Sequence, residues 1–175
     1  MKIKAVIPAL ALALSLAGCS GSPEKGLEYL EAGEYEQAEE EFQAAAEKGN
    51  HPGEAYRGLG IARWELKDYE GAKKAFKSAL ENGAQKTGTL YNFIGCCALR
   101  LEEPSSALNY FNLGLTREGN SEELVQEMKY NVIAAYEQME DWQSAVQKLE
   151  EYLEEYPDDE NARKELTFLE TRELE

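Results

Sequence analysis

The sequence predicts an all-α protein in which pairs of helices repeat along the chain and stack into an α-solenoid. Three observations lead to this fold class. Four segments of similar sequence recur, two kinds of small residue keep a constant distance within the segments, and turn-forming residues separate one segment from the next. In such an array each helix pair contacts only its neighbours. A small rotation from one pair to the next curves the stack, so the fold class also predicts an extended concave surface.

The first 18 residues have the layout of a secretory signal peptide. A short basic start with Lys2 and Lys4 precedes an apolar run from Ala5 to Leu16, which ends in small residues. A membrane-spanning helix needs about 20 apolar residues, so this run is too short to cross a bilayer. We therefore predict that residues 1–18 are a targeting segment that is removed from the mature chain.

The motif Leu16-Ala17-Gly18-Cys19 closes this segment and resembles the lipobox of bacterial lipoproteins. The resemblance implies cleavage between Gly18 and Cys19 and acyl chains, such as palmitate, carried by the Cys19 sulfur through diacylglycerol. Two acyl chains anchor a protein, whereas one gives only reversible binding, at about 10⁴ M⁻¹. The alternatives are an ordinary signal peptide cut near Ala17 and a cysteine that stands there by chance, and the sequence leaves the number of acyl chains open.

The mature chain is expected to be strongly acidic. The whole sequence has 18 basic and 34 acidic residues, and removal of Lys2 and Lys4 leaves 16 basic residues and a net charge of −18. Such a surface repels nucleic-acid phosphates and anionic lipid headgroups, which argues against nucleic-acid partners and favours neutral or basic ones. The alternative is that the acidity only keeps an exported protein soluble.

Four segments carry the repeat. They are GEYEQAEEEFQAAAE from Gly33, KDYEGAKKAFKSALE from Lys67, EEPSSALNYFNLGL from Glu102 and EDWQSAVQKLEEYLE from Glu140. Their shared small residues are separated by 34, 35 and 38 positions: Ala38, Ala72, Ala107 and Ala145. Twelve residues before each alanine stands a second shared position, occupied by Gly26, Gly60, Gly95 and Ile133. Two positions that keep the same period indicate a repeated structural unit.

This pattern resembles the tetratricopeptide repeat, in which about 34 residues form two antiparallel helices. The resemblance implies a right-handed superhelical α-solenoid of about four helix pairs, at residues 23–52, 53–87, 88–121 and 122–157. A short lipidated tether at 19–22 precedes the pairs, and a capping helix at 158–175 follows them. The small residues are expected where paired helices approach closely, beside the large residues Phe42, Phe76, Phe111 and Leu149. Ile133 and Pro104 depart from the pattern, in place of a glycine and an aromatic residue.

Local signals indicate where particular helices begin. Ser22 followed by Pro23 is typical of a helix start, with the serine as N-cap and the proline in the first turn. Ser121 followed by two glutamates predicts a longer first helix in the fourth repeat, beginning near Glu122. In the C-terminal segment, Ala162, Leu166 and Leu169 share one helical face and predict the capping helix.

The chain shows no catalytic or metal-binding pattern. Its single histidine, His51, stands beside Pro52 in a turn between repeats, with no Cys or His at ligand spacing. The glycines follow the repeat period and form no phosphate-binding loop. Acidic runs such as Glu39-Glu40-Glu41 and Glu150-Glu151 are interpreted as solvated helix faces. We expect no metal, no cofactor and no enzymatic activity.

Adjacent cysteines at 96 and 97 raise the question of redox chemistry. Neighbouring residues of a helix point about 100° apart, so a disulfide between them would break the local geometry. Cys97 aligns with Ala62 and Ala135 and is expected to pack between repeats. Cys96 is expected to be a free thiol that lines the groove.

The family resemblance implies that the first helices line a groove that binds peptides or protein segments. Groove-facing positions carried over from the family are Arg57, Ile61, Trp64, Asn92, Cys96, Leu99, Arg100, Tyr130, Asn131 and Glu137. The candidate binding residues among them are Arg57, Trp64, Asn92, Arg100, Tyr130 and Asn131. Asparagine can bond a peptide backbone, arginine can bind a carboxylate, and the aromatic rings offer flat apolar area.

The sequence therefore predicts a membrane-anchored bacterial lipoprotein that acts as a non-catalytic scaffold for protein or peptide partners close to the membrane. The alternative is an assembly factor of a cell-envelope machine, for outer-membrane protein insertion or for a pilus or secretin. A catalytic or enzyme-accessory lipoprotein and a small-solute receptor are further classes. The expected location is the extracytoplasmic face of the cell membrane or, alternatively, the periplasmic face of an outer membrane.

Overall fold

A computed structural model of the chain describes residues 21–173. The predicted signal peptide and Cys19 lie outside the described residues. Within this part the chain forms nine helices: α1 (Pro23–Ala32), α2 (Tyr35–Glu47), α3 (Pro52–Glu65), α4 (Tyr69–Glu81), α5 (Gly88–Arg100), α6 (Pro104–Leu115), α7 (Glu122–Gln138), α8 (Trp142–Glu155) and α9 (Glu160–Glu173).

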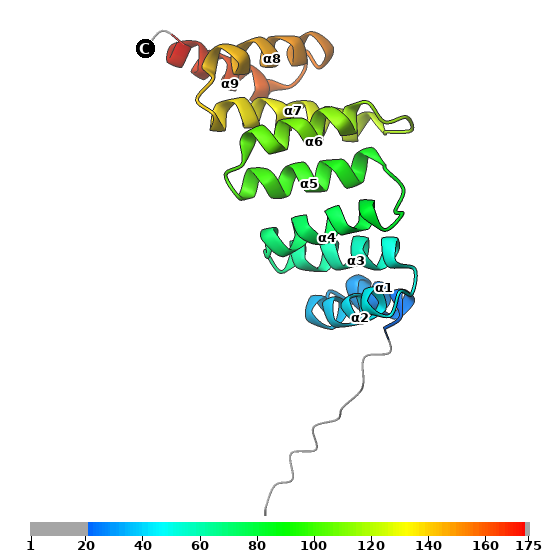
Figure 1. The fold of residues 1–175 in the computed structure, drawn as a ribbon. Coiled ribbons are helices and arrows are strands. Elements are labelled where there is room, and N and C mark those ends of the chain that lie inside the picture. The colour runs from blue at the N-terminus through cyan, green and yellow to red at the C-terminus, as the bar shows by residue number, and fades with distance from the viewer. Residues whose placement is uncertain (1–20, 174–175) are drawn as a thin grey trace, which may run out of the picture.

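The helices pack in consecutive pairs, so the all-α solenoid predicted from the sequence is confirmed. Each helix packs against the helix before it and the helix after it. Figure 1 shows the pairs stacked from α1 and α2 at one end to α7 and α8 at the other, where α9 follows them. Among residues 21–173, every helix is too short or too polar to span a bilayer.

In the first three repeats, a phenylalanine from the second helix packs directly on a glycine of the first helix. A Cβ atom on Gly60 would lie 2.5 Å from the Phe76 ring, and one on Gly95 would lie 2.4 Å from the Phe111 ring. Such distances are too short for any side chain, so the close packing requires glycine. Gly26 stands in the same relation to Phe42, at 2.8 Å.

The fourth repeat fills the same space in a different way. Ile133 replaces the glycine and Leu149 replaces the phenylalanine, and both are buried in one apolar cluster with Ala145. A larger side chain on the first helix is thus matched by a smaller one on the second. This exchange explains why Ile133 departs from the sequence pattern. The total side-chain volume between the two helices is kept, but more of it comes from the first helix and less from the second.

The capping residues lie where the sequence predicted them. The Ser22 hydroxyl accepts a hydrogen bond from the Lys25 N–H at 3.3 Å, and the Ser121 hydroxyl accepts one from the Leu124 N–H at 3.2 Å. The turn inside each helix pair contains one residue with a left-handed backbone. These residues are Gly33, Lys67, Glu102 and Glu140, with φ angles of 75°, 63°, 58° and 57°.

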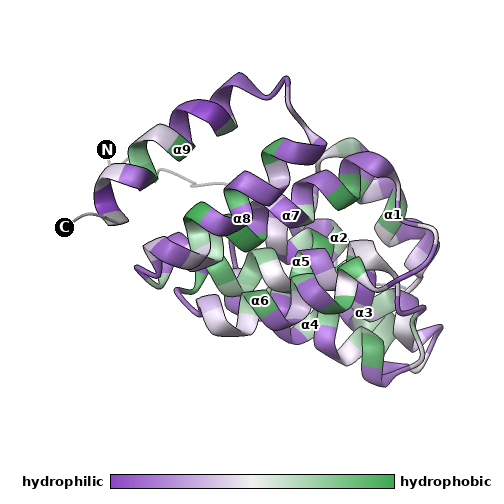
Figure 2. Cartoon of the chain, turned by 90° about the horizontal axis from the view of Figure 1, so that it is seen from above, coloured by the Kyte–Doolittle hydropathy of each residue, from purple (hydrophilic) through white to green (hydrophobic). Residues whose placement is uncertain are grey.

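Helix α9 closes the C-terminal end of the stack. Its residues Ala162 and Leu169 are buried against the last helix pair, and Figure 2 shows that α9 is otherwise largely hydrophilic. Thr167 lies 34 residues after Ile133, so α9 follows the pattern of the first helices. An exposed threonine at the glycine position suits a helix that ends the array, because it gives no further helix an apolar surface to pack on.

Candidate binding surface

The first helices of successive repeats lie side by side and form a continuous surface. Helix α1 contacts α3, and α5 contacts α7. Trp64 of α3 meets Phe93 of α5 with ring centroids 6.0 Å apart, and Tyr130 of α7 is hydrogen-bonded to Glu165 of α9. We call this surface, formed by α1, α3, α5, α7 and α9, the groove.

The N-terminal part of the groove carries two exposed arginines and a half-buried tryptophan. Arg57 forms an ion pair with Glu54 on its own helix, at 2.7 Å. The Arg100 guanidinium lies 5.7 Å from the centre of the Tyr69 ring, which also packs edge-on against Trp64 at 5.1 Å. Both arginine side chains are exposed to solvent, so both can reach a bound molecule.

Asn92, predicted to bind a peptide backbone, is instead buried and already hydrogen-bonded. Asn92 is only 7% exposed. The Asn92 amide donates to Glu127 at 2.9 Å, while its carbonyl oxygen accepts from the Asn131 amide at 3.3 Å. Asn92 therefore braces α5 against α7, and a partner would have to displace these bonds to use it.

The two adjacent thiols are free, and both are shielded from reaction. Burial raises the pKa of Cys96 and that of Cys97 to about 12. A thiol reacts as the thiolate, which is scarce so far below its pKa. Cys97 is fully buried, and the half-buried Cys96 lies 3.5 Å from the Asn131 amide nitrogen. The pair contributes packing and a weak polar contact.

A hollow of about 430 Å³ opens in the C-terminal part of the groove, where α7 meets the start of α9. It is lined by Glu123, Gln126, Glu127, Tyr130, Asn131, Tyr152, Asp159 and Asn161. We call it the acidic hollow, because three of these residues are carboxylates and no lysine or arginine is among them. Two tyrosine rings form part of its wall, with the centroids of Tyr130 and Tyr152 5.4 Å apart.

Hydrogen bonds fix most of the wall of the acidic hollow. The Tyr152 hydroxyl donates to Asp159 at 2.9 Å and accepts from the Gln126 amide at 2.8 Å. Asp159 also accepts from the backbone N–H groups of Asn161 and Ala162, both at 3.0 Å. These bonds, the Ala162 N–H first, lower the pKa of Asp159, which keeps it ionised.

Burial perturbs two further carboxyl groups, one on α9 and one near the end of α7. Desolvation raises the pKa of Glu165, whose carboxylate accepts the Tyr130 hydroxyl, and it also raises the pKa of Glu137. One oxygen of Glu137 is buried with no hydrogen-bond partner among the described residues. The C-terminal part of the groove is thus negative, whereas its N-terminal part carries arginines.

Comparison with known families identifies the repeat. The tetratricopeptide repeat family matches residues 24–87, and a second description of the same repeat matches residues 130–159. Together the two matches cover more than half of the chain.

The chain is a tetratricopeptide repeat (TPR) protein.

Solved structures share the fold of this TPR protein at low sequence identity. YrrB, described as a TPR protein with an unusual peptide-binding site, is 21% identical and has a TM-score of 0.73, covering 86% of this chain and 75% of that one. A TPR protein from Parabacteroides merdae is 24% identical with a TM-score of 0.70, covering 86% and 58%. The pilF protein of Pseudomonas aeruginosa is 17% identical with a TM-score of 0.62, covering 81% and 63%.

These likenesses establish the fold and leave the partner open. No curated protein matches the sequence significantly. Both family matches are to repeats that are typically non-catalytic, and neither is to an enzyme. Within residues 21–173, no group of three or more His, Cys, Asp or Glu side chains is arranged to hold a metal ion.

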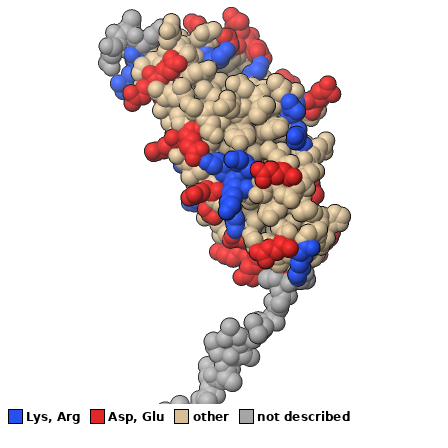
Figure 3. All heavy atoms as spheres, in the orientation of Figure 1, with Lys and Arg blue, Asp and Glu red and all other residues tan. Residues whose placement is uncertain are grey.

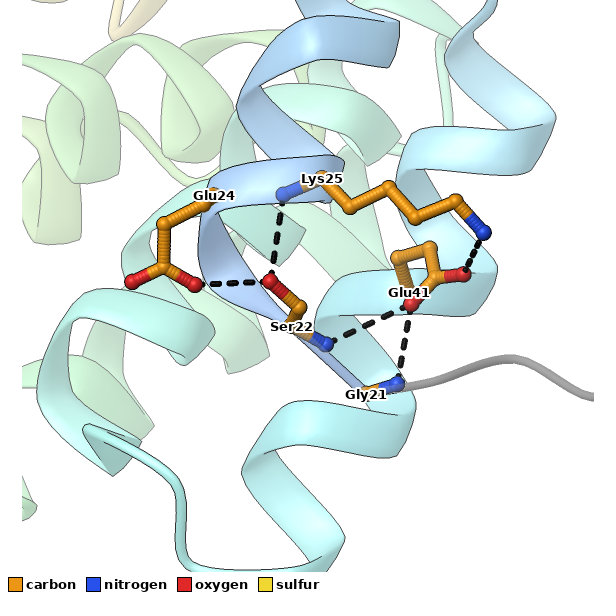
Figure 4. A network of polar contacts seen from close by, with 5 residues as sticks. All are labelled: Gly21, Ser22, Glu24, Lys25 and Glu41. Carbon is orange, nitrogen blue, oxygen red and sulfur yellow. Dashed lines mark hydrogen bonds and ion pairs between the residues drawn. The ribbon is translucent and has the colours of Figure 1, made fainter.

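One carboxylate that the sequence placed on a solvated face is buried. Glu41 is 2% exposed, and its oxygens accept from the backbone N–H of Gly21 at 2.9 Å and that of Ser22 at 3.3 Å. Lys25 completes the arrangement with an ion pair at 2.7 Å, as Figure 4 shows. The interpretation of Glu39-Glu40-Glu41 as a wholly exposed run was therefore wrong for Glu41.

This arrangement, the Glu41 clamp, also shortens the predicted tether. Gly21 is buried, and its carbonyl oxygen accepts the Asn50 amide at 3.1 Å. Its φ angle of +65° and the 2.9 Å that would separate a Cβ from the Ala44 backbone both require glycine. Residues 21 and 22, predicted as part of a tether at 19–22, are docked on the first repeat.

The opposite surface of the TPR protein, formed by the second helices, carries a basic group on α4. Figure 3 shows Lys and Arg atoms gathered over this helix, with acidic residues around them. The lysines are Lys73, Lys74 and Lys77, and a shallow hollow beside them also includes Glu70, Glu81 and Glu103. Lys73 is paired with Glu103 at 2.6 Å. Neighbouring acids balance these lysines, so this surface is a weaker candidate than the groove.

The acidic hollow is the part of the site that sequence reasoning missed. Tyr130 and Asn131 were candidates, whereas Gln126, Tyr152 and Asp159 were not. Asp159 follows the last repeat, and no spacing in the sequence brings it beside α7. The only available signal was the alignment of α9 with the first helices, which places its start at the groove.

Proposed function

We propose that this TPR protein is a membrane-anchored bacterial lipoprotein that binds protein or peptide partners in its groove without catalysing a reaction. The observation that carries the proposal is the groove itself, a continuous surface of first helices with exposed arginines at one part and an open acidic hollow at the other. The peptide-binding site described for YrrB supports a peptide or protein segment as the ligand class.

The proposed anchor rests on the sequence around Cys19. The lipobox supplies the thiol that carries acyl chains, and the described chain begins two residues later at the docked Gly21. We place the protein on the extracytoplasmic face of the cell membrane or, in a two-membrane bacterium, on the periplasmic face of the outer membrane. Partners are then proteins close to that membrane.

Site-directed photo-crosslinking in cells tests the groove. A photoreactive amino acid at Arg57 or Arg100 is expected to capture the same partner from both positions, since both side chains are exposed on the groove. Glu150, exposed on α8 among the second helices, is the control position and is expected to capture none. If the control captures the partner and the two groove positions do not, the groove is not the binding surface.

Fractionation of cells tests the anchor. The Cys19→Ala variant is expected to leave the membrane fraction, because only a thiol can carry the thioether-linked lipid. Extraction of the wild-type protein by detergent, but not by high salt, is the companion measurement. A variant that stays in the membrane fraction as completely as the wild type would show that Cys19 is not the anchor.

A second candidate is an assembly factor of a cell-envelope machine. The structural likeness to pilF of Pseudomonas aeruginosa favours it, although at 17% identity this likeness concerns the fold. The same crosslinking experiment separates the candidates, because an assembly factor should capture a subunit of an envelope complex. Deletion of the gene should then reduce the amount of the assembled complex, while a general scaffold would leave it unchanged.

A further inference from the structure

An apolar row runs across the groove. Each first helix has an apolar residue directly after its glycine position, and the row consists of Leu27, Ile61, Cys96, Ala134 and Phe168. Leu27 and Phe168 are 47% and 54% exposed, while the other three are half-buried. The described residues contain four exposed large hydrophobic side chains, and two of them lie in this row. The two exposed members thus lie at the ends of the row, on α1 and α9, and the three half-buried members between them offer further apolar contact along the same surface.

The acidic hollow makes the C-terminal part of this surface negatively charged. Glu123, Glu127 and Asp159 face a space with no lysine or arginine in its wall, and the Tyr130 and Tyr152 rings stand beside it. A carboxylate accepts hydrogen bonds and attracts a cation, and a tyrosine ring adds a cation–π contact. In a protein partner, a lysine or arginine side chain supplies such a cation.

We propose that the groove binds an extended, basic and amphipathic segment of a partner protein, with a lysine or arginine in the acidic hollow and apolar side chains along the apolar row. The inference rests on the proposed function and names the chemistry of the partner. Neighbouring packed helices lie about 8–10 Å apart, so the five residues of the row span roughly 32–40 Å. An extended chain covers this distance with about twelve residues.

Charge elsewhere on the protein favours the same partner. The sequence has nearly twice as many acidic as basic residues, so a basic segment is attracted from a distance and an acidic one is repelled. Long-range attraction by the net charge alone would not select one site on the protein. The acidic hollow differs from the rest because its carboxylates surround a concave space, where one cation meets several acceptors at once.

Binding of defined peptides to the mature chain with Cys19→Ser, which carries no lipid, tests the inference. The probe is a twelve-residue peptide with two lysines at one end and leucine at alternate later positions. Fluorescence anisotropy measures its binding. One matched peptide replaces lysine by glutamate, and another replaces leucine by serine. We expect the lysine–leucine peptide to bind at least tenfold more tightly than the glutamate peptide.

Paired variants separate the acidic hollow from general charge attraction. The double variant Glu123→Gln with Glu127→Gln removes two charges from the hollow and keeps an acceptor for Asn92. Its control, Glu150→Gln with Glu154→Gln, removes two charges from exposed positions of α8. The first is expected to weaken binding of the lysine–leucine peptide at least fivefold, and the control less than twofold. Equal weakening in the two variants, or equal binding of the glutamate peptide, overturns the inference.

The Phe168→Ser variant tests the apolar row. This variant is expected to weaken binding of the lysine–leucine peptide at least threefold. Binding of the serine peptide should not change, because that peptide has no leucine that could contact Phe168. If no peptide binds although Arg57 and Arg100 still crosslink a partner, or if the captured segment contains no lysine or arginine, this inference fails and the groove function stands. If the crosslinks fail as well, the proposed function fails.

Discussion

The first and fourth repeats solve the same three structural problems in opposite ways. In the first repeat, Gly26 leaves room for Phe42, and Gly33 adopts the left-handed turn. In the fourth, Ile133 packs with Leu149 and Glu140 takes the left-handed turn position. Each repeat also withdraws a carboxylate from solvent, which is Glu41 in the first and Glu137 in the fourth.

The carboxylates show the contrast most clearly. Glu41 is almost fully buried, and its oxygens are bonded by two backbone N–H groups and Lys25. Glu137 is half-buried, and one of its oxygens has no partner among the described residues. The fourth repeat, which adjoins the acidic hollow, thus keeps small energetic costs that the first repeat avoids. Such costs concentrate at functional sites in many proteins.

The test with the largest expected effect gives the first repeat the packing of the fourth. Gly26→Ile forces a side chain against the Phe42 ring, which would lie 2.8 Å from the Cβ, and should cost about 3 kcal/mol of unfolding free energy. Adding Phe42→Leu should recover about half of the loss. Full recovery is not expected, because Phe42 also packs on Gly58 of the next repeat. Urea denaturation measures both values, and a double variant no more stable than the single one would contradict volume exchange.

The second test removes the clamp of the first repeat. Glu41→Ala leaves the buried N–H of Gly21 and the partly buried N–H of Ser22 without their acceptor, and we expect a loss of about 2 kcal/mol. Hydrogen exchange should also become faster in α1 than in α8. The matched variant Glu137→Ala removes a poorly bonded carboxylate of the fourth repeat, so its loss should be much smaller. Equal losses in the two variants would remove the contrast between the carboxylates.

The third test concerns the left-handed turns. Gly33→Ala places a side chain at a φ angle of 75°, and should destabilise the protein by about 1 kcal/mol. Glu140→Gly relieves the corresponding strain at 57°, and should stabilise the protein by about 0.5 kcal/mol, since glycine also increases the entropy of the unfolded chain. Thermal unfolding shows both shifts, and shifts of the same sign would mean that backbone strain does not distinguish the turns.

The smallest effect concerns the pH dependence of Glu137. Because burial raises the pKa of Glu137, the folded chain binds this proton more tightly than the unfolded chain. Stability therefore falls as the pH rises from the ordinary glutamate pKa to the raised one; the penalty is complete above the raised pKa and absent below the ordinary glutamate range. Glu137→Gln should raise stability at pH 7, by less than about 1 kcal/mol, and give no gain near pH 4. A gain of equal size at both pH values would show that ionisation is not the cause.

The repeated small residues made the fold predictable. Ala38, Ala72, Ala107 and Ala145 are fully buried, because two helices can approach this closely only over small side chains. The same requirement repeats in every pair, so it leaves a period that can be read without a structure. The exchange at Ile133 broke the pattern at one position only, since the alanine twelve residues later kept the register.

Contacts between repeats were harder to predict. Nothing in the residue type of Asn92 shows that Glu127 and Asn131 use its amide group in the folded chain. For Glu41 a signal did exist in the alignment, because Ala75 lies at the equivalent position 34 residues later and is buried. A periodic pattern thus predicts which positions are enclosed, while the polar partners found there depend on side chains brought together by folding.

The Glu41 clamp would determine how far the protein can reach from the proposed anchor at Cys19. A domain on a long flexible linker explores a volume set by the length of that linker, which dilutes its binding surface over a broad shell. Here the chain is docked from Gly21 onward, so a lipid on Cys19 would leave a single residue, Ser20, between the anchored residue and the folded body. The groove could then reach partners only within one length of the solenoid from the bilayer. Binding would depend on the distance of a partner from the membrane as much as on its sequence.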